Sequence, residues 1–223
     1  MTHRLILGLL LLALAGCASS GMSSNGRPDP GDDYSGADAG TLVYAVGTVR
    51  GFGMRFAFPY SRTQALSGET VDDWQGRIRP SVGGAVYLKI LNPDFEGFET
   101  GHLVTRALPP GRYNIRDFEF FGSGPAGSYG WSSAVPFSIA FTIEPGKATY
   151  IGSFMRSLAP PGDTGKIGAA GYFIVANRAA RDLLIARERL PSDTVVMEQV
   201  TDVDRFGSAV LRSRSLEPAD AVP

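Results

Sequence analysis

Short runs in which large apolar residues alternate with small or polar ones constrain the fold of this chain more than any other feature. The clearest run extends from Val135 to Ile143, where every second residue is apolar. A repeat of two residues places the large side chains on one face of a β-strand, whereas a helix needs spacings of three and four. The run is therefore predicted to be a strand with one buried face, and Pro136 near its beginning suits a strand start or a sheet edge.

Further strands are expected in segments that are rich in β-branched and aromatic residues. They cover residues 42–49, 52–58, 85–91, 102–108, 113–121, 148–155 and 171–176. The pairs Pro110-Gly111 and Pro145-Gly146 favour type II turns, because proline presets φ to about −65° and glycine accepts a positive φ. Many short strands at this spacing, with no helical pattern between them, predict a mainly β fold, an antiparallel β-sandwich.

One helix is predicted near the end of the sandwich, over about residues 178–190. Asn177 can cap its N-terminus, and Pro191 stops it. Its apolar stripe is expected to consist of Leu183, Leu184 and Leu190. We expect this helix to pack across an edge of the sandwich, with a short strand at residues 194–198 after it.

The first residues of the chain have the pattern of an export signal. Arg4 gives a positive start, and residues 5–14 form an apolar run that is too short to cross a bilayer, which needs about 20 residues. The run ends in Leu14-Ala15-Gly16-Cys17, which resembles the lipobox of bacterial lipoproteins. The resemblance implies that residues 1–16 are removed and that Cys17 carries a diacylglycerol and a further acyl chain. Two or three chains hold a protein on a membrane, whereas one chain binds only marginally.

Residues 17–40 are then the lipidated cysteine and a flexible tether. The tether is rich in Ser, Gly, Asp and Pro, and its root-mean-square reach is about 25–30 Å. Ala18 follows the cysteine in place of the aspartate that tends to keep such lipoproteins at the inner membrane. The resemblance therefore implies the outer membrane, with the protein facing the periplasm. The sandwich domain is expected over residues 41–198, followed by a weakly ordered tail over residues 199–223.

The resemblance extends beyond the signal to the turns between strands. The segments Leu108-Pro-Pro-Gly-Arg-Tyr113, Ile143-Glu-Pro-Gly-Lys147 and Tyr150-Ile-Gly152 are similar to those of uncharacterised proteobacterial envelope lipoproteins. Those proteins carry transthyretin-like or immunoglobulin-like sandwiches, and the likeness covers roughly residues 85–155. It implies a fold and brings no catalytic residues with it.

Composition argues against several kinds of chemistry. Cys17 is the only cysteine, so no disulfide is expected, and His102 is the only histidine that remains once His3 leaves with the signal. A zinc site of the usual kind needs three or four such ligands. The formal net charge of −1 at pH 7 favours no nucleic-acid partner. We therefore expect no metal of this kind, no cofactor and no catalytic role for His102.

A weak calcium candidate lies between two predicted strands. Asp94, Glu96 and Glu99 lie around Gly97 in a run with oxygen side chains at alternate positions, as in calcium loops. The twelfth position of such a loop would be Leu103 instead of the usual glutamate. A solvated turn is the competing interpretation.

Acid–base catalysis on a glycan is a second possibility for the acidic residues. Asp72 and Asp73 precede Trp74, and Glu96 and Glu99 flank an aromatic residue. A glycoside hydrolase needs two carboxyl groups about 5–10 Å apart in one cleft, which spacing in loops does not establish.

A Gly- and Ser-rich loop over residues 122–133 is the most suggestive binding element. It carries Tyr129 and Trp131 between two well-patterned strands, and exposed aromatic residues on such loops bind sugars or proteins. The same residues can instead cover the end of the core. The leading hypothesis is a non-catalytic module that binds a protein or glycan partner in the envelope. An acid–base enzyme acting on envelope glycan and a structural component of an envelope assembly are the alternatives.

Overall fold

The structure is a computed structural model that describes most of the chain after residue 32. The described ranges are residues 33–50, 55–66, 74–80, 82–83, 89–90, 92–124, 127–131, 133, 135–158 and 171–214. The expected signal, most of the expected tether and Cys17 lie outside the described residues. Within the described ranges, no helix is both long and apolar enough to cross a membrane.

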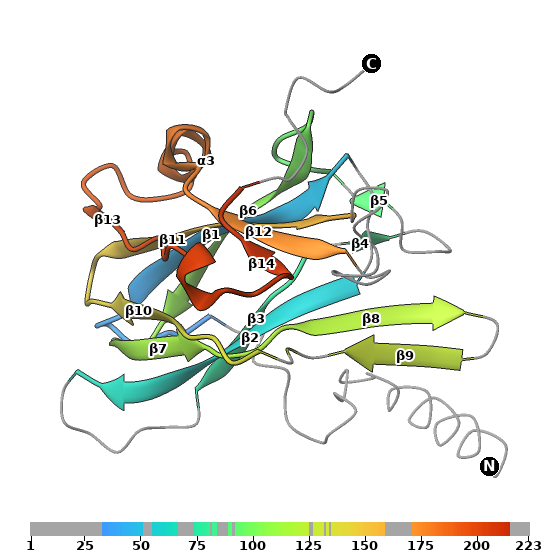
Figure 1. Cartoon of the computed structure of the whole chain (residues 1–223). Coiled ribbons are helices and arrows are strands. Elements are labelled where there is room, and N and C mark those ends of the chain that lie inside the picture. Colours follow the sequence, from blue (N-terminus) through green and yellow to red (C-terminus); the bar gives the residue numbers. More distant parts are fainter. Residues whose placement is uncertain are drawn as a thin grey trace, which may run out of the picture. The chain divides into compact units, whose positions relative to one another are not determined.

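Two sheets form the body of the described protein (Figure 1). The first has the strand order β14-β12-β11-β1-β6, and β13 also pairs with β11. Its strands are β1 (Gly40–Val49), β6 (Glu99–Leu108), β11 (Ala148–Ser157), β12 (Tyr172–Ala176), β13 (Val196–Glu198) and β14 (Leu211–Arg212). The one α-helix of the described ranges, α3 (Ala179–Arg187), follows β12.

The second sheet has the order β10-β7-β2-β8-β9, and β3 also pairs with β2. Its strands are β2 (Arg55–Ala65), β3 (Gln75–Ile78), β7 (Gly111–Ile115), β8 (Glu119–Gly124), β9 (Gly127–Trp131) and β10 (Ile139–Ile143). A small separate sheet pairs β4 (Val82–Gly83) with β5 (Lys89–Ile90), and a 3₁₀ turn, η1, spans Asp204–Phe206.

An aromatic core lies between the two large sheets. Phe58 of β2 packs against Phe154 and Phe173 of the first sheet, with ring centroids 5.1 and 4.8 Å apart. Such edge-to-face packing adds to the stabilisation from burial. The predicted mainly β sandwich with one helix is therefore confirmed. Most strand pairs are antiparallel, but β1–β11, β11–β13 and β12–β14 are parallel.

One expected strand is divided into two. Residues 113–121 were predicted as a single strand, but the chain leaves β7 after Ile115 and re-enters the sheet as β8 at Glu119. Between them, the Asp117 carboxylate accepts the backbone N–H groups of Phe118 and Ser133 at 2.8 and 2.7 Å. Side-chain bonds of this kind compete with the strand ladder and bend the chain away from it.

The helix position differs from the expectation. The first sheet is apolar on both faces, and every residue of β11 and β12 is buried. A second buried face needs a cover, so α3 packs against this face, where it contacts β1, β6 and β11, and not across an edge. Its buried residues are Asp182 and Ala186, whereas Leu184, expected on the apolar stripe, is 64% exposed.

Both ends of the described part are better packed than the sequence predicted. A weakly ordered tail is predicted over residues 199–223, of which 215–223 lie outside the described residues. In the described part Val203 and Leu211 are fully buried and β14 pairs with β12. The sequence did not predict this packing because the apolar side chains of the segment are spaced too irregularly to show a period. Residues 33–40 were assigned to the tether, yet the Tyr34 N–H donates to the Ala107 carbonyl at 2.9 Å.

Candidate functional site

A bulge in β11 changes which side chains point toward α3 on the first sheet. Val43 of β1 lies opposite Tyr150, but the next paired residue, Ala45, lies opposite Ser153. The added backbone includes Gly152, whose φ of +108° is one that residues with a side chain rarely adopt. Because a bulge interrupts the alternation of side chains, Tyr150 and Ser153 both reach α3 although they are three residues apart.

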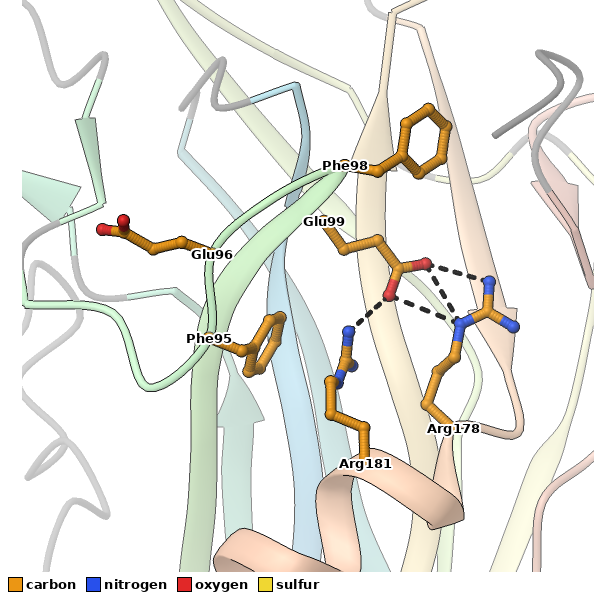
Figure 2. A pocket seen from close by; sticks show the side chains of 6 residues that line it. All are labelled: Phe95, Glu96, Phe98, Glu99, Arg178 and Arg181. Carbon is orange, nitrogen blue, oxygen red and sulfur yellow. Dashed lines mark hydrogen bonds and ion pairs between the residues drawn. The ribbon is translucent and has the colours of Figure 1, made fainter. Parts of the chain in front are cut away.

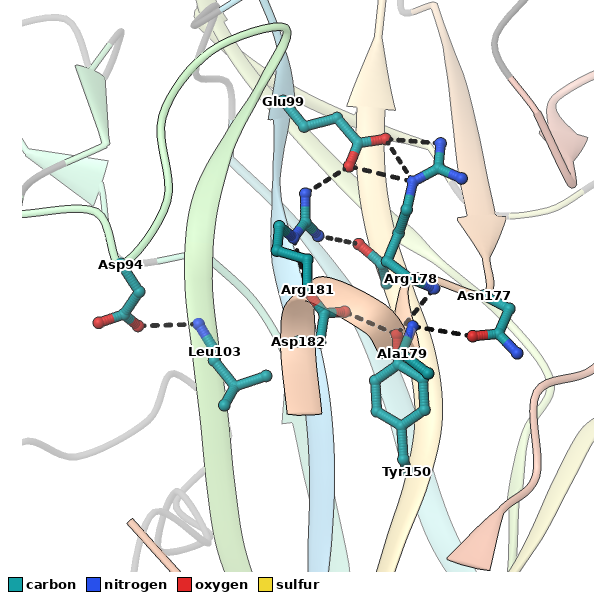
Figure 3. Close-up of polar contacts among 10 residues, drawn as sticks. Asp94, Glu99, Leu103, Tyr150, Asn177, Arg178, Ala179, Arg181 and Asp182 are labelled. Carbon is teal, nitrogen blue, oxygen red and sulfur yellow. Dashed lines mark hydrogen bonds and ion pairs between the residues drawn. The ribbon is translucent and has the colours of Figure 1, made fainter. Parts of the chain in front are cut away.

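Tyr150 joins the sheet to the start of the helix (Figure 3). Its hydroxyl donates to Asp182 at 2.6 Å and accepts the backbone N–H of Arg178 at 3.1 Å. Asn177, predicted as the cap, accepts the N–H of Ala179 at 2.9 Å. These bonds satisfy backbone donors that a helix start would otherwise leave unpaired.

Asp182 is the most enclosed acid of the described chain and is 0% exposed. Its second oxygen accepts from Nε of Arg181 at 2.7 Å. Burial raises the pKa of Asp182, because a charged carboxylate loses hydration there, although both of its neighbours donate to it. Burial and the adjacent carboxylate likewise raise the pKa of Tyr150.

Glu99, at the start of β6, lies between two guanidinium groups. Its side chain is 8% exposed and accepts from Nη2 of Arg178 at 3.0 Å and from Nη1 of Arg181 at 2.7 Å. The Nε of Arg178 adds longer contacts of 3.2 and 3.4 Å to the same carboxylate. The Glu99 carboxylate is therefore bonded on both oxygens and has two guanidinium groups as neighbours.

Every guanidinium nitrogen of Arg181 donates a hydrogen bond within this network. Its Nε donates to Asp182 and its Nη1 to Glu99, while its Nη2 donates to Ser153 at 3.2 Å. The guanidinium carbon lies 3.7 Å from the ring centroid of Phe95, which is a cation–π contact. Arg178 differs, because no contact of its Nη1 is found within the described ranges and its side chain is 40% exposed.

These side chains surround an open hollow of ≈ 280 Å³ (Figure 2). Its lining residues are Phe95, Glu96, Phe98, Glu99, Arg178 and Arg181. Figure 2 shows the Glu99 carboxylate turned toward both arginines, whereas Glu96 points away from them. The hollow thus combines aromatic rings with a fixed array of charged groups at the surface.

The outer edge of β6 beside the hollow is covered by side chains and by the preceding turn. The N–H of Leu103 donates to the Asp94 carboxylate at 2.8 Å, and its carbonyl accepts from Arg189, which also pairs with Asp94. Gly101 exchanges backbone hydrogen bonds with Phe95 on the same edge. We refer to Asp94 and Arg189 as the β6 clasp, because together they replace a neighbouring strand at Leu103.

The calcium candidate is not assembled. Asp94 is paired with Arg189, Glu99 with Arg178 and Arg181, and Glu96 is exposed. No group of three His, Cys, Asp or Glu side chains able to hold a metal ion occurs in the described part of the chain. The sequence pattern was misleading because arginines from α3 and the turn after it, distant in the chain, take up two of the carboxylates.

The other sequence candidates lie elsewhere or outside the described residues. Tyr129 and Trp131 belong to β9, opposite Gly122 and Phe120 of β8, so the expected loop is a hairpin. The side chains of Tyr129 and Trp131 lie outside what the structure describes, as do Asp72 and Asp73.

His102 has no link to the hollow among the described contacts. Its Nδ1 is 3.9 Å from Asp94, and its Nε2 is buried with no hydrogen-bond partner in the described part.

Sequence reasoning missed the residues from β11 and α3. One signal was present: Asp182 and Ala186 are four residues apart, so a carboxylate shares a helix face with a small apolar residue. A buried acid requires donors, and Arg181 is the adjacent residue. The other two residues of the network could not be predicted from local sequence. Tyr150, which bonds to Asp182, is 32 residues away from it, and Glu99, which bonds to Arg181, is 82 residues away.

Comparisons with known proteins identify no relative of this chain. No protein-family model matches it, and no curated protein matches it. A solved leucine-rich repeat protein from Bacteroides thetaiotaomicron aligns with a TM-score of 0.28 and 11% sequence identity. The alignment covers 52% of this chain and 14% of that protein, and a likeness this weak supports no conclusion about fold or function.

Proposed function

We propose that this protein is an envelope lipoprotein, anchored through Cys17, that binds a protein or glycan partner without catalysing a reaction. The observation that carries the binding role is the hollow beside α3, where aromatic and charged side chains meet at the surface. Binding sites are typically concave, with apolar walls and a few fixed polar groups. The anchor and its outer-membrane location rest on the lipobox resemblance.

The state of the carboxylates favours binding over acid–base catalysis. A general acid must hold a proton near neutral pH, and this requires a carboxyl group whose ionised form is disfavoured. The oxygens of Glu99 instead accept hydrogen bonds from two guanidinium groups, and Glu96 is exposed. Asp182 has a raised pKa, but it is fully buried and bonded to Tyr150 and Arg181. These three acids thus have the surroundings of structural or recognition groups.

The anchor is tested at Cys17. Replacement by alanine is expected to block lipidation, so the protein should leave the membrane fraction or remain unprocessed. Mass spectrometry of the mature N-terminus should show an acylated cysteine. An unmodified Cys17, or an N-terminus that lies before it, would exclude the anchor.

Binding is tested with isolated cell envelopes and three variants. Arg178→Ala changes the hollow, Trp131→Ala changes the hairpin, and Arg187→Ala is the matched control, an exposed arginine of the same helix outside the hollow. We expect retention on envelopes to fall for Arg178→Ala and to stay unchanged for Arg187→Ala. Loss confined to Trp131→Ala would move the binding surface to β9. Turnover of envelope glycan that disappears in Glu99→Gln, with folding intact, would favour the enzyme.

A further inference from the structure

We infer that the hollow binds a sugar that carries a carboxylate, with that carboxylate on Arg178 and the sugar ring beside Phe98. The inference rests on the proposed binding function and narrows its partner to one chemical class. It depends on three features of the described residues: the unused donors of Arg178, the aromatic wall, and the covered edge of β6.

One edge of the Arg178 guanidinium has no acceptor among the residues that the structure describes. An arginine carries five N–H donors, and Glu99 takes up Nε and one hydrogen of Nη2. The Nη1 group and the second Nη2 hydrogen form the remaining fork, whose geometry matches a carboxylate. Figure 2 shows Nη1 turned away from Glu99. Because Glu99 already orients the guanidinium, binding costs little additional side-chain entropy.

Arg178 is distinguished from its neighbour by this spare capacity. Each of the three nitrogens of Arg181 donates to an acceptor within the described residues, so Arg181 holds the site together, whereas Nη1 of Arg178 has no acceptor there. Replacing Arg178 therefore removes a ligand contact and leaves Glu99 paired with Arg181. Replacing Arg178 should therefore weaken ligand binding, whereas replacing Arg181 should disrupt the network itself, and this difference makes the assignment testable.

Phe98 supplies an apolar surface in the same hollow as Arg178. The side chain of Phe98 is half-buried. The ring of Phe95, by contrast, is already in cation–π contact with the guanidinium group of Arg181. A sugar ring has apolar C–H groups, which pack against an aromatic side chain, and hydroxyl groups, which bond to charged side chains. The hollow has side chains of both types.

The covered edge of β6 favours a sugar over an extended peptide. A peptide that binds beside a strand needs free backbone N–H and C=O groups on the strand edge. At Leu103 these groups are bonded to the β6 clasp, and at Gly101 they are bonded to the turn that contains Phe95. The hollow thus offers side chains only, which suits a ligand recognised by its own hydroxyl and carboxylate groups.

The test uses the full protein and two sugars that differ in one group. Methyl glucuronide carries a carboxylate where methyl glucoside carries a hydroxymethyl group. In NMR titrations we expect the glucuronide to bind and the glucoside to bind at least about 10-fold more weakly, as expected when a charge-assisted hydrogen bond is lost. Arg178→Ala should remove this preference, Arg178→Lys should retain part of it, and Arg187→Ala should leave it intact.

Several results would overturn the inference. Equal affinity for both sugars, or glucuronide binding that survives in Arg178→Ala, would exclude the proposed carboxylate contact. Tighter binding of N-acetyl-aspartyl peptides would assign the hollow to an acidic peptide. Failure of both sugars, while Arg178→Ala still reduces retention on envelopes, would reject the ligand class and leave the binding function in place. Failure of both assays would reject the hollow as a binding site.

Discussion

Replacing Glu99 with glutamine tests whether the charge of this carboxylate holds α3 on the sheet. The substitution keeps the shape of the side chain, so it creates no cavity, and it removes the negative charge between Arg178 and Arg181. Breaking a buried ion pair from one side costs about 3–5 kcal/mol. Here the arginine side chains are 40% and 29% exposed, so water replaces part of the lost interaction. We therefore expect a loss of about 2–3 kcal/mol.

Urea unfolding of the purified protein measures this loss. For a domain of this size m is roughly 2 kcal/mol/M, so the midpoint should fall by about 1 M with m unchanged. Glu119→Gln is the matched control, because Glu119 and Arg77 form an ion pair of 3.4 Å that is 30% and 40% exposed on the two sides. Such a pair contributes about 0–1 kcal/mol. If both variants lost the same stability, the reasoning about the Glu99 network would be wrong.

Three other predictions concern the bulge, the buried acid and the clasp. Gly152→Ala should destabilise the protein by about 1–3 kcal/mol and by more than Gly146→Ala, because both have positive φ but only at Gly152 would the added Cβ meet other atoms, the nearest 3.1 Å away. Burial raises the pKa of Asp182 above its ordinary 3.8, so its contribution to stability is full below that value and declines as the pH rises through the raised pKa. The free energy of unfolding of the wild type, minus that of Asp182→Asn, should therefore decrease from pH 4 upward in urea titrations, and an increase would contradict the raised pKa. Replacing both Asp94 and Arg189 with alanine removes the β6 clasp and uncovers the edge of β6 at Leu103. Self-association measured by light scattering should increase, because free strand edges pair with other chains. A strictly monomeric double variant would show that the clasp is dispensable.

The strands that the sequence predicted are those with a local signal. In β10, Phe141 and Ile143 are buried on one side while Ala140 is exposed, as the period-2 alternation required, but the strand begins at Ile139 and not at Val135, which is 41% exposed. Pro191 and Asn177 bracketed the helix for an equally local reason, since capping and chain termination depend on adjacent residues. Together these patterns sufficed for the sandwich class and for the presence of one helix.

The site depended on contacts between residues that are distant in the chain. Nothing near Glu99 in the sequence indicates that Arg178 and Arg181 will pair with it, and so the calcium and acid–base hypotheses remained open. The face of the helix was also misjudged, because Leu184 has the hydrophobicity of a core residue but is 64% exposed, whereas Asp182 is buried. Bonds to Tyr150 and Arg181 offset the burial of that charge, and both exist only in the folded protein.

Local patterning determined which segments become strands, because side-chain alternation and turn chemistry act over a few residues. Tertiary structure decided how β1 and β11 pair, where the Gly152 bulge directs Tyr150 and Ser153, and which carboxylates meet arginines. The physical reason is that a polar side chain acquires its role from the partners that desolvate it and bond to it. For Glu99 and Asp182 those partners include groups from separate strands and the helix, which only the packed sheet brings together.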